Sequence, residues 1–421
     1  MQRLIFVNRF FFPDHSATSQ ILSDLAIHLA ATGREVHVVT SGQIYDDPHA
    51  SLPDHEIVNE VRVHRVASTR FGRGTLPGRS MDYLSFYRSV RRRLLDIARQ
   101  GDLIVAKTDP PLVSLVAMAA ARRNGAGLIN WLQDLYPEIA VELGVPLLRG
   151  PLAAGLAELR NRSLRRAEAN VAVGQLMGER LKALGAPPAR IHVIPNWCND
   201  EDIRPVSREE NPLRREWALD GKFVVGYSGN LGRAHEFDTV LAAAERLRGD
   251  ARIVFVMIGG GNRFDELERI VKGRGLDASF RFMAYQERKV LAYSLGVPDV
   301  HWLSLQPKLE GLVVPSKFYG IAAAGKPIIV ISGKNGELAR LVQHHDCGVV
   351  IEPGDGAGLA ATVLRLSNAP EAVAAMGVRA RQMLEADFCR QKAFERWRRL
   401  LEELDGGFQN GANCPAMTPR R

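Results

Sequence analysis

The strongest constraint on the fold is an alternation of short β-rich runs with amphipathic segments, which stops once and then begins again. In the first half, apolar runs such as VHVV (residues 36–39) alternate with stretches such as residues 16–33, where apolar residues recur at helical spacing. A polar, proline-bearing segment at residues 191–206 breaks the pattern, and KFVVGYSGN (residues 222–230) restarts it. Such alternation is typical of parallel sheets flanked by helices, so we expect two doubly wound, Rossmann-like α/β domains in tandem.

The length of 421 residues fits two domains better than one, because single cores stop growing at about 250–300 residues. We expect an N-terminal domain at residues 1–198 and a C-terminal domain at residues 199–388. The amphipathic segment at residues 389–405 predicts a helix that packs back across the domain junction. Residues 406–421 have almost nothing to bury and are expected to form a disordered tail.

Arginine is concentrated in two parts of the first half, and the net charge of the chain is +8. These arginines fit a solvated face, an anionic membrane surface or a phosphate-bearing substrate. Arginines mix with leucine and isoleucine at helical spacing in residues 88–98, which favours a helix lying on a surface over nucleic-acid binding. The two clusters are Arg62, Arg65, Arg70, Arg73, Arg79, Arg88, Arg91, Arg92 and Arg93, accompanied by the single acid Asp82, and Arg160, Arg162, Arg165 and Arg166.

The sequence predicts a cytoplasmic protein. The opening residues MQRLIFVN contain an apolar run of four residues, which is typical of a β-strand and too short for a signal peptide. No window of 18 uninterrupted apolar residues occurs, so no membrane-spanning helix is expected. The four cysteines, at positions 198, 347, 389 and 414, lack CxxC spacing, which fits reduced thiols rather than disulfides or zinc.

The stretch EGLVVPSKFYGIAAAGKP, at residues 310–327, places an acid and a lysine beside a short helix of small residues. We expect Ser316 to cap this helix. A helix N-terminus, together with the full charge of Lys317, suits a phosphate group. Glu310 precedes that end and is placed to hold sugar hydroxyls. The alternative is a surface loop that leads into a core helix.

Two strands of the second half end in glycine turns, YSGNLGR at residues 227–233 and MIGGGN at residues 257–262. Glycines allow backbone N–H groups to approach phosphate oxygens closely. The alternative is a plain link from strand to helix, and the absence of G-x-G-x-x-G argues against a dinucleotide site. With the preceding motif these turns predict a binding site for a nucleoside diphosphate. Its candidate residues are Gly229, Asn230, Arg233, Gly259, Gly260, Gly261, Tyr285, Gly311, Leu312, Pro315, Ser316, Tyr319 and Gly320.

Two loops of the first half follow strands and carry polar side chains at the expected ligand side of the sheet. The first loop is WLQDLYPE at residues 131–138. Its Asp134 is a candidate catalytic residue, as are Glu310 and Lys317 of the second half. The second, FFFPDHSATSQ at residues 10–20, could reach the donor phosphates or the acceptor. Solvated loops are the alternative for both. The candidate residues for contact with a second substrate are Asp14, His15, Ser19, Tyr136 and Glu138.

Asp200 and Asp202 have the D-x-D spacing of some metal sites. They lie in the segment between the domains rather than at the centre of a sheet. We therefore expect no metal ion and no other cofactor.

Taken together, these motifs resemble those of a known enzyme family, the retaining GT-B glycosyltransferases of family 4, also called group 1. The nearest members build bacterial capsule, O-antigen and exopolysaccharide. The resemblance spans nearly the whole chain and is carried by VIPN (193–196), the two glycine turns, PKLEGLVVPSKFYGIAAAGKP (307–327) and NGELARLV (335–342). It implies two domains that face each other across a cleft, with the nucleotide sugar on the C-terminal domain and the acceptor on the N-terminal one.

The resemblance also implies the reaction. A sugar would pass from a nucleoside-diphosphate sugar, expected to be UDP-linked, to a hydroxyl of a glycan or lipid-linked sugar, with retention and without a metal. The arginine clusters would hold the enzyme at the inner face of the cytoplasmic membrane. Two other functions share the fold: a sugar-nucleotide 2-epimerase, which turns over its donor without an acceptor, and a non-catalytic sugar-nucleotide-binding subunit.

Three positions depart from the family pattern. The family motif is a glutamate, seven residues and a second glutamate; Glu310 matches the first, but Phe318 or Gly320 stands at the second, which usually holds the ribose. Asn230 stands near the position of a phosphate-binding arginine, for which Arg233 would compensate. A histidine–aspartate pair is replaced by glutamine 133 and Asp134.

Overall fold

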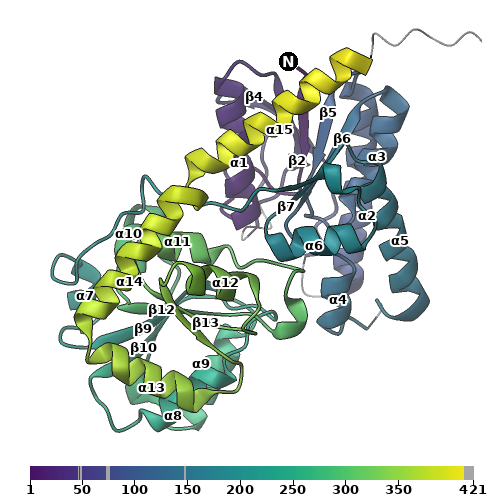
Figure 1. Cartoon of the computed structure of the whole chain (residues 1–421). Coiled ribbons are helices and arrows are strands. Elements are labelled where there is room, and N and C mark those ends of the chain that lie inside the picture. The colour runs from purple at the N-terminus through teal and green to yellow at the C-terminus, as the bar shows by residue number, and fades with distance from the viewer. Residues whose placement is uncertain (46, 48–49, 73–75, 147, 412–421) are drawn as a thin grey trace, which may run out of the picture. The chain divides into compact units, whose positions relative to one another are not determined.

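The computed structural model describes residues 1–45, 47, 50–72, 76–146 and 148–411 (Figure 1). The chain divides into two compact units, each built on its own sheet. The first unit holds residues 1–195 and the described residues from Ala393 onward, and the second holds Asn196–Lys392. The expected parallel-sheet α/β architecture is confirmed in both units.

The first unit contains an eight-stranded sheet in the order β3-β4-β2-β1-β5-β6-β7-β8. Neighbouring strands are parallel, except that β3 and β4 pair antiparallel at one edge. The strand order reverses between β1 and β5, and ligands of such sheets bind beside this point, at the carboxyl ends of the strands. The strands are β1 (Leu4–Val7), β2 (Val36–Ser41), β3 (His55–Val58), β4 (Val61–Val66), β5 (Leu103–Ala106), β6 (Gly127–Leu132), β7 (Ala169–Ala172) and β8 (Ile191–Val193).

Helices α2 and α3 lie on one face of this sheet (Figure 1). Their buried apolar side chains pack against it. Phe86, Val90 and Leu94 of α2 recur at helical spacing and are fully buried against β1 and β5. The helices are α1 (Ala17–Ala31), α2 (Leu76–Ile97), α3 (Val113–Asn124), α4 (Glu138–Glu142), α5 (Gly150–Arg166) and α6 (Gln175–Ala183).

The second unit contains a six-stranded parallel sheet in the order β11-β10-β9-β12-β13-β14. The order reverses between β9 and β12, which places their carboxyl ends at the expected ligand side. The strands are β9 (Phe223–Asn230), β10 (Ile253–Gly260), β11 (Phe280–Met283), β12 (Val300–Ser304), β13 (Ile328–Ile331) and β14 (Gly348–Ile351).

Helices α8, α9 and α13 cover one face of the second sheet (Figure 1). Tyr227, Phe255 and Trp302 are fully buried in the core on this face. The helices are α7 (Pro212–Glu216), α8 (Asp238–Arg246), α9 (Phe264–Gly273), α10 (Leu291–Gly296), α11 (Lys317–Ala323), α12 (Glu337–His344), α13 (Gly356–Ser367) and α14 (Pro370–Met383).

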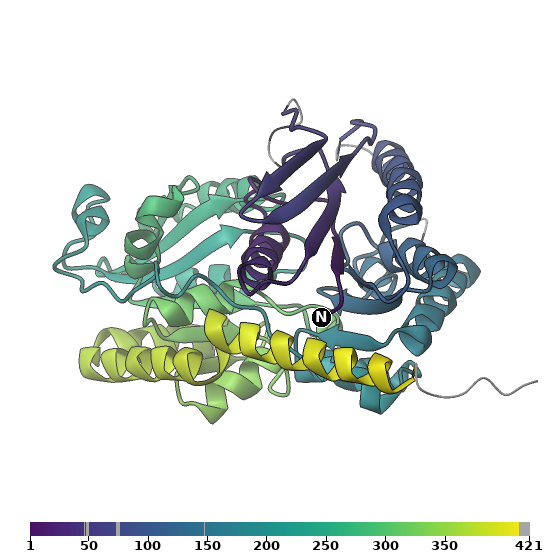
Figure 2. The same ribbon diagram turned by 90° about the horizontal axis from the view of Figure 1, so that it is seen from above.

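The last helix, α15 (Arg390–Gly411), is continuous in both views (Figures 1 and 2). Its residues from Ala393 onward belong to the first unit, where the ring centroids of Trp397 and Trp131 are 4.7 Å apart. Asp405 accepts a hydrogen bond from Arg34 at 2.6 Å, which anchors the helix near its end. Helix α15 continues to Gly411, so residues 406–411 are helical, whereas the expected helix ends at residue 405. The rest of the predicted tail, 412–421, lies outside the described residues.

In the part of the chain that the structure describes, no helix combines the length and the apolar character that a membrane span requires.

Candidate active site

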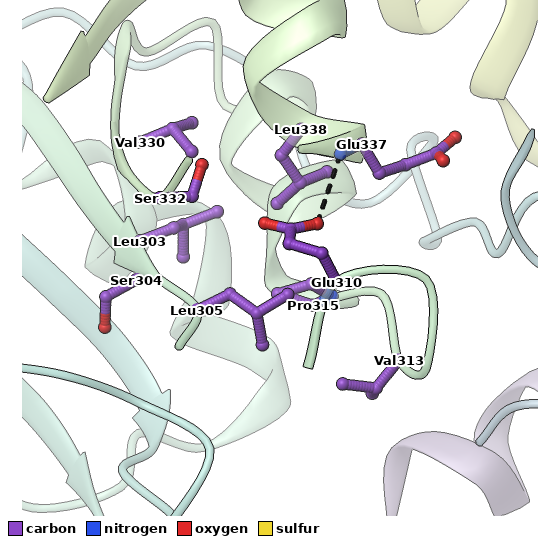
Figure 3. A pocket seen from close by; sticks show the side chains of 10 residues that line it. All are labelled: Leu303, Ser304, Leu305, Glu310, Val313, Pro315, Val330, Ser332, Glu337 and Leu338. Atoms are coloured by element: carbon purple, nitrogen blue, oxygen red, sulfur yellow. Dashed lines mark hydrogen bonds between the residues drawn. The ribbon is translucent and has the colours of Figure 1, made fainter. Parts of the chain in front are cut away.

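Glu310 lies in a small pocket at the carboxyl ends of β12 and β13 (Figure 3). Its Oε2 accepts a hydrogen bond from the backbone N–H of Glu337 at 3.3 Å, so the carboxylate lies at the N-terminus of α12, where the helix dipole favours negative charge. Gly336 makes this approach possible, because a Cβ there would be 2.4 Å from Glu310 Oε1. The pocket is lined by Leu303, Ser304, Leu305, Glu310, Val313, Pro315, Val330, Ser332, Glu337 and Leu338.

Lys317 is the first residue of α11 and lies at the same end of the sheet. Its aliphatic stem passes over Gly229, where a Cβ would be 2.7 Å from Lys317 Cε. Its Nζ lies 5.4 Å from the ring centroid of Tyr227 and 3.4 Å from Nε2 of His235. Burial lowers the pKa of Lys317 to about 8, and no acid among the described residues raises it. A partly buried cation of this kind suits an anionic group.

Ser316 does not cap α11 as expected. Its backbone is already helical, with φ −66° and ψ −19°, and its side chain makes no capping hydrogen bond. An N-cap residue normally has extended dihedral angles that direct its side chain back to the first N–H groups, which explains why the predicted cap is wrong. The ammonium group of Lys317 is thus the main group that would attract an anion at this end of α11.

Sequence reasoning missed His235, which follows the first glycine turn. Its Nδ1 lies 2.8 Å from the carbonyl oxygen of Ser304, and its Nε2 faces Lys317. Burial and the nearby lysine lower the pKa of His235 to about 3, so the ring is neutral at physiological pH. Its role depends on β12 and α11, which are distant in sequence, so no local signal could have found it.

The glycines of the two turns pack against each other at the ends of β9 and β10. A Cβ at Gly259 would be 2.4 Å from the carbonyl oxygen of Gly229, and one at Gly261 would be 2.7 Å from the backbone nitrogen of Leu231. Backbone packing therefore requires these glycines without any ligand, and their contact with phosphate stays a prediction. Asn230 and Arg233 are both exposed.

Two tyrosines of the predicted donor site differ in exposure. Tyr285 is 61% exposed, and its ring covers Gly260, where a Cβ would be 3.0 Å from ring Cε2. Tyr319 is 1% exposed, with its ring centroid 5.8 Å from that of Phe388. Tyr319 therefore lies in the core on the inner side of α11, and its contact with the donor stays a prediction.

The two residues that stand in place of the second motif glutamate, Phe318 and Gly320, both lie in apolar surroundings. Phe318 is fully buried, and a Cβ on Gly320 would lie 3.5 Å from Leu295. Leu312 is also buried, while Gly311 has a positive φ of 72°. These positions offer a ribose no side-chain polar group.

In the first unit, Asp134 follows β6 in a pocket that also contains Lys107. Sequence reasoning missed Lys107, which is 1% exposed; its Nζ donates to the carbonyl oxygen of Thr18 at 2.9 Å and lies 4.0 Å from the Trp131 ring centroid. Burial raises the pKa of Asp134 to about 6, reinforced by Asp109 and opposed by Lys107. Burial likewise lowers the pKa of Lys107 to about 7. An acid and a base that act on each other, and whose pKa values are both shifted by burial, indicate a candidate functional site.

The other two predicted acceptor-binding residues of this segment, Tyr136 and Glu138, differ in their surroundings. Burial raises the pKa of Tyr136, which lines the same pocket. Glu138 is paired with the buried Arg160, which also donates to the carbonyl oxygen of Tyr136 at 3.0 Å. Arg160 therefore belongs to the interior and not to the predicted basic surface. Its guanidinium is retained there because Glu138 compensates its charge.

The loop between β1 and α1 is held by its own polar side chains. Asp14 accepts hydrogen bonds from the backbone N–H groups of Ser16 at 2.9 Å and Tyr45 at 2.5 Å. Ser19 is fully buried and donates to the carbonyl oxygen of Asp14 at 3.1 Å. Asp14 and Ser19 thus shape the loop, and their contact with the acceptor stays a prediction. His15 is exposed and stays a candidate.

The first arginine cluster is only partly on the surface. Arg65 is buried and paired with Glu56, whereas Arg88, Arg91 and Arg92 of α2 are exposed. Arg73 lies outside the described residues.

Both aspartates of the D-x-D sequence, Asp200 and Asp202, accept hydrogen bonds from other residues of the chain. Asp200 accepts a hydrogen bond from the backbone N–H of Arg390 at 3.0 Å, which caps α15. Asp202 accepts one from Asn199 at 2.6 Å.

Two family models match most of the chain. The model described as a glycosyl transferase 4-like domain matches residues 17–197, and the model described as glycosyl transferases group 1 matches residues 209–383. The chain is 29% identical over 272 residues to the probable glycosyltransferase WbjE of Pseudomonas aeruginosa, covering 64% of this chain and 66% of that protein. It is 28% identical over 240 residues to the putative colanic acid biosynthesis glycosyl transferase WcaI of Escherichia coli, covering 55% and 58%. The chain thus matches 66% and 58% of the length of these two curated relatives.

Solved structures share the fold. Sucrose-phosphate synthase of Thermosynechococcus elongatus superposes with a TM-score of 0.77 at 16% identity, over 97% of this chain and 100% of that one. Anabaena HepE in complex with UDP-glucose superposes with a TM-score of 0.70 at 16% identity, over 96% and 100%.

Proposed function

Because the chain belongs to the glycosyltransferases, with a 4-like domain followed by a group 1 domain, we propose that it transfers a sugar from a nucleoside-diphosphate sugar to a hydroxyl group. The acceptor is a glycan or a lipid-linked sugar, and the product belongs to a bacterial surface polysaccharide. The name of the relative WcaI, which refers to colanic acid biosynthesis, supports this assignment.

We assign the donor site mainly from the position and charge of Lys317. It is a cation without an acidic partner among the described residues, and it lies at the carboxyl ends of β9 and β12. A diphosphate would supply the missing negative charge. We assign the donor to the UDP class because the HepE fold relative holds UDP-glucose. Tyr285 is exposed beside this site and offers its ring to the base.

The proposed chemistry depends on charge stabilisation. As the sugar–phosphate bond breaks, negative charge grows on the leaving diphosphate, and the ammonium of Lys317 stabilises it without a metal ion. Glu310 orients the donor sugar from its pocket beside α12. The acceptor hydroxyl attacks the same face of the sugar, a phosphate oxygen takes its proton, and the configuration is retained. Asp134 binds the acceptor in the first unit.

A panel of nucleoside diphosphates and their sugars tests this function by thermal shift. At about 100 times its Kd, the cognate nucleotide should raise the Tm by about 5 °C, because a ligand that binds only the folded state stabilises it. The cognate sugar nucleotide is then incubated with lipid-linked acceptors to detect transfer. Turnover of UDP-N-acetylglucosamine without any acceptor would instead indicate an epimerase, and binding without turnover a non-catalytic subunit.

We also propose that α2 attaches the protein to anionic membranes. Arg88, Arg91 and Arg92 are exposed on this helix, and Met81 and Leu84 are 50% and 61% exposed nearer its start. Arginine is attracted to anionic headgroups, while exposed apolar side chains insert between them.

Changing Arg88, Arg91 and Arg92 together to glutamine should weaken binding to phosphatidylglycerol vesicles by about 100-fold at low salt, since each basic residue near the surface contributes about 1 kcal/mol. Vesicle co-sedimentation measures the effect. The control variant changes Arg246, Arg248 and Arg269, exposed arginines of the second unit, and so lowers the net charge equally. Equal binding by both triple variants would contradict a specific role for α2.

A further inference from the structure

His235 is fixed in one tautomer by its hydrogen bonds. Its Nδ1 lies 2.8 Å from the carbonyl oxygen of Ser304, which can only accept, so Nδ1 carries the proton. In a neutral ring the other nitrogen is then an acceptor. That nitrogen, Nε2, lies 3.4 Å from Nζ of Lys317, whose ammonium can only donate. The histidine therefore receives a hydrogen bond from the lysine.

The loop that carries His235 is held independently of Lys317. The N–H of Gln306 donates to the carbonyl oxygen of Ala234 at 3.1 Å, and the N–H of Glu236 donates to Ser304 Oγ at 3.0 Å. Arg263 donates to the carbonyl oxygen of His235 itself at 3.0 Å. The backbone around His235 is thus attached to the end of β12 and to the turn after β10, while the imidazole itself is held by the carbonyl oxygen of Ser304. It is a fixed point against which a flexible lysine side chain can be held.

A neutral acceptor has an advantage over a carboxylate at this position. A lysine side chain has four rotatable bonds and is disordered unless its end is held. A carboxylate would hold Lys317 but would also neutralise it and repel an incoming phosphate. A neutral imidazole directs one N–H of the ammonium and leaves the full positive charge for an anion. Gly229 and the Tyr227 ring complete this arrangement with two further neutral groups.

We propose that His235 is a positioning residue for the diphosphate of the donor: it holds the ammonium of Lys317 in the orientation in which the lysine meets the phosphate oxygens. This inference rests on the proposed function, and it names a residue outside the donor set derived from the sequence. His235 does not touch the substrate and acts through Lys317.

A matched pair of variants separates the two hydrogen bonds of the ring. His235→Asn places an amide near the position of Nδ1, so it can still donate to Ser304 but cannot reach Lys317. His235→Gln places its amide oxygen near the position of Nε2 and preserves the acceptor for Lys317. Calorimetry with UDP, or with the nucleoside diphosphate that the panel selects, measures affinity, and the corresponding nucleoside serves as a ligand without phosphate.

We expect His235→Asn to weaken nucleoside diphosphate binding about tenfold, the effect of losing a hydrogen bond to a charged group. Nucleoside binding should be unchanged, and His235→Gln should restore diphosphate affinity to within about twofold of the wild type. Equal losses for nucleoside and diphosphate would show that His235 only supports the fold and would overturn the proposal. So would unchanged diphosphate affinity in His235→Asn. Absence of nucleotide binding in the wild-type protein would instead overturn the proposed function, and this inference with it.

A second measurement does not depend on how well the variants fold. Nitrogen NMR of the wild-type protein with labelled histidine distinguishes a protonated ring nitrogen from an unprotonated one. At neutral pH, His235 should show a protonated Nδ1 and an unprotonated Nε2, and only the Nε2 signal should shift strongly when the nucleoside diphosphate binds. A protonated Nε2 would overturn the proposal, because it could not accept from Lys317.

Discussion

Replacing Lys317 with methionine should lower kcat/KM for sugar transfer by about 10²- to 10³-fold, the usual effect of removing one group that stabilises developing negative charge. Methionine keeps most of the length and apolar character of the stem that packs over Gly229, so the fold should be little affected. The loss should also appear as weaker binding of the nucleoside diphosphate, because the ammonium contacts the phosphate before the bond breaks. Calorimetry and initial rates measure the two effects.

Lys326 provides a matched control for Lys317. It is 9% exposed, and burial lowers its pKa to about 8, as for Lys317. It precedes β13, however, so it lies at the amino end of that strand, away from the carboxyl ends where ligands bind. Lys326→Met should change the free energy of unfolding but not nucleotide affinity. Equal loss of affinity in both variants would contradict the assigned role of Lys317.

The pH dependence of binding follows from the same lysine. Because burial lowers the pKa of Lys317 to about 8, the free protein loses this positive charge as the pH rises through 8. Diphosphate affinity should therefore fall by about twofold from pH 7 to 8, and by up to about tenfold per pH unit above. His235 does not contribute, since its pKa of about 3 keeps it neutral throughout this range. Lys326→Met should keep this fall, and Lys317→Met should lose it.

The architecture was predictable because it depends on local periodicity. The runs at β9, β10 and β13 are short, apolar and separated by helical segments, and this pattern leaves few alternatives to parallel sheets. The placement of Glu310 and Lys317 was also predictable, since both follow β12 in the chain and lie at the carboxyl end of the second sheet. That a ligand binds at this end stays a prediction.

The side-chain environments were not predictable, because they depend on contacts between distant segments. The role of His235 requires β12 and α11, and the pairing of Arg160 requires α4. The burial of Tyr319 depends on which side of a seven-residue helix faces the core, and Phe388 lies far along the chain. Composition identified the arginine clusters but could not indicate that Arg65 is buried and forms an ion pair with Glu56.

The geometry around Glu310 gives the second large expected effect. Glu310→Ala removes both the sugar-orienting carboxylate and the acceptor for the N–H of Glu337, so transfer should fall by about 10²-fold. Stability should fall by about 1 kcal/mol, as for loss of a helix cap. Glu310→Gln keeps an acceptor oxygen for α12 but loses the charge. Its stability should be near that of the wild type, and its kcat should remain low if the charge orients the sugar.

Gly336→Ala tests the position of Glu310 without altering the carboxylate itself. The backbone of Gly336, with φ −63° and ψ 157°, is open to alanine, so the substitution adds no backbone strain. Its Cβ would be 2.4 Å from Glu310 Oε1, and the carboxylate must therefore move. A displacement of about 1 Å at a reacting centre can cost about 10²-fold, and we expect a loss of kcat approaching that of Glu310→Ala. Gly333→Ala, in the same loop with nothing within 4 Å of its Cβ, should retain full activity. Full activity in both Gly336→Ala and Glu310→Gln would mean that Glu310 only caps α12.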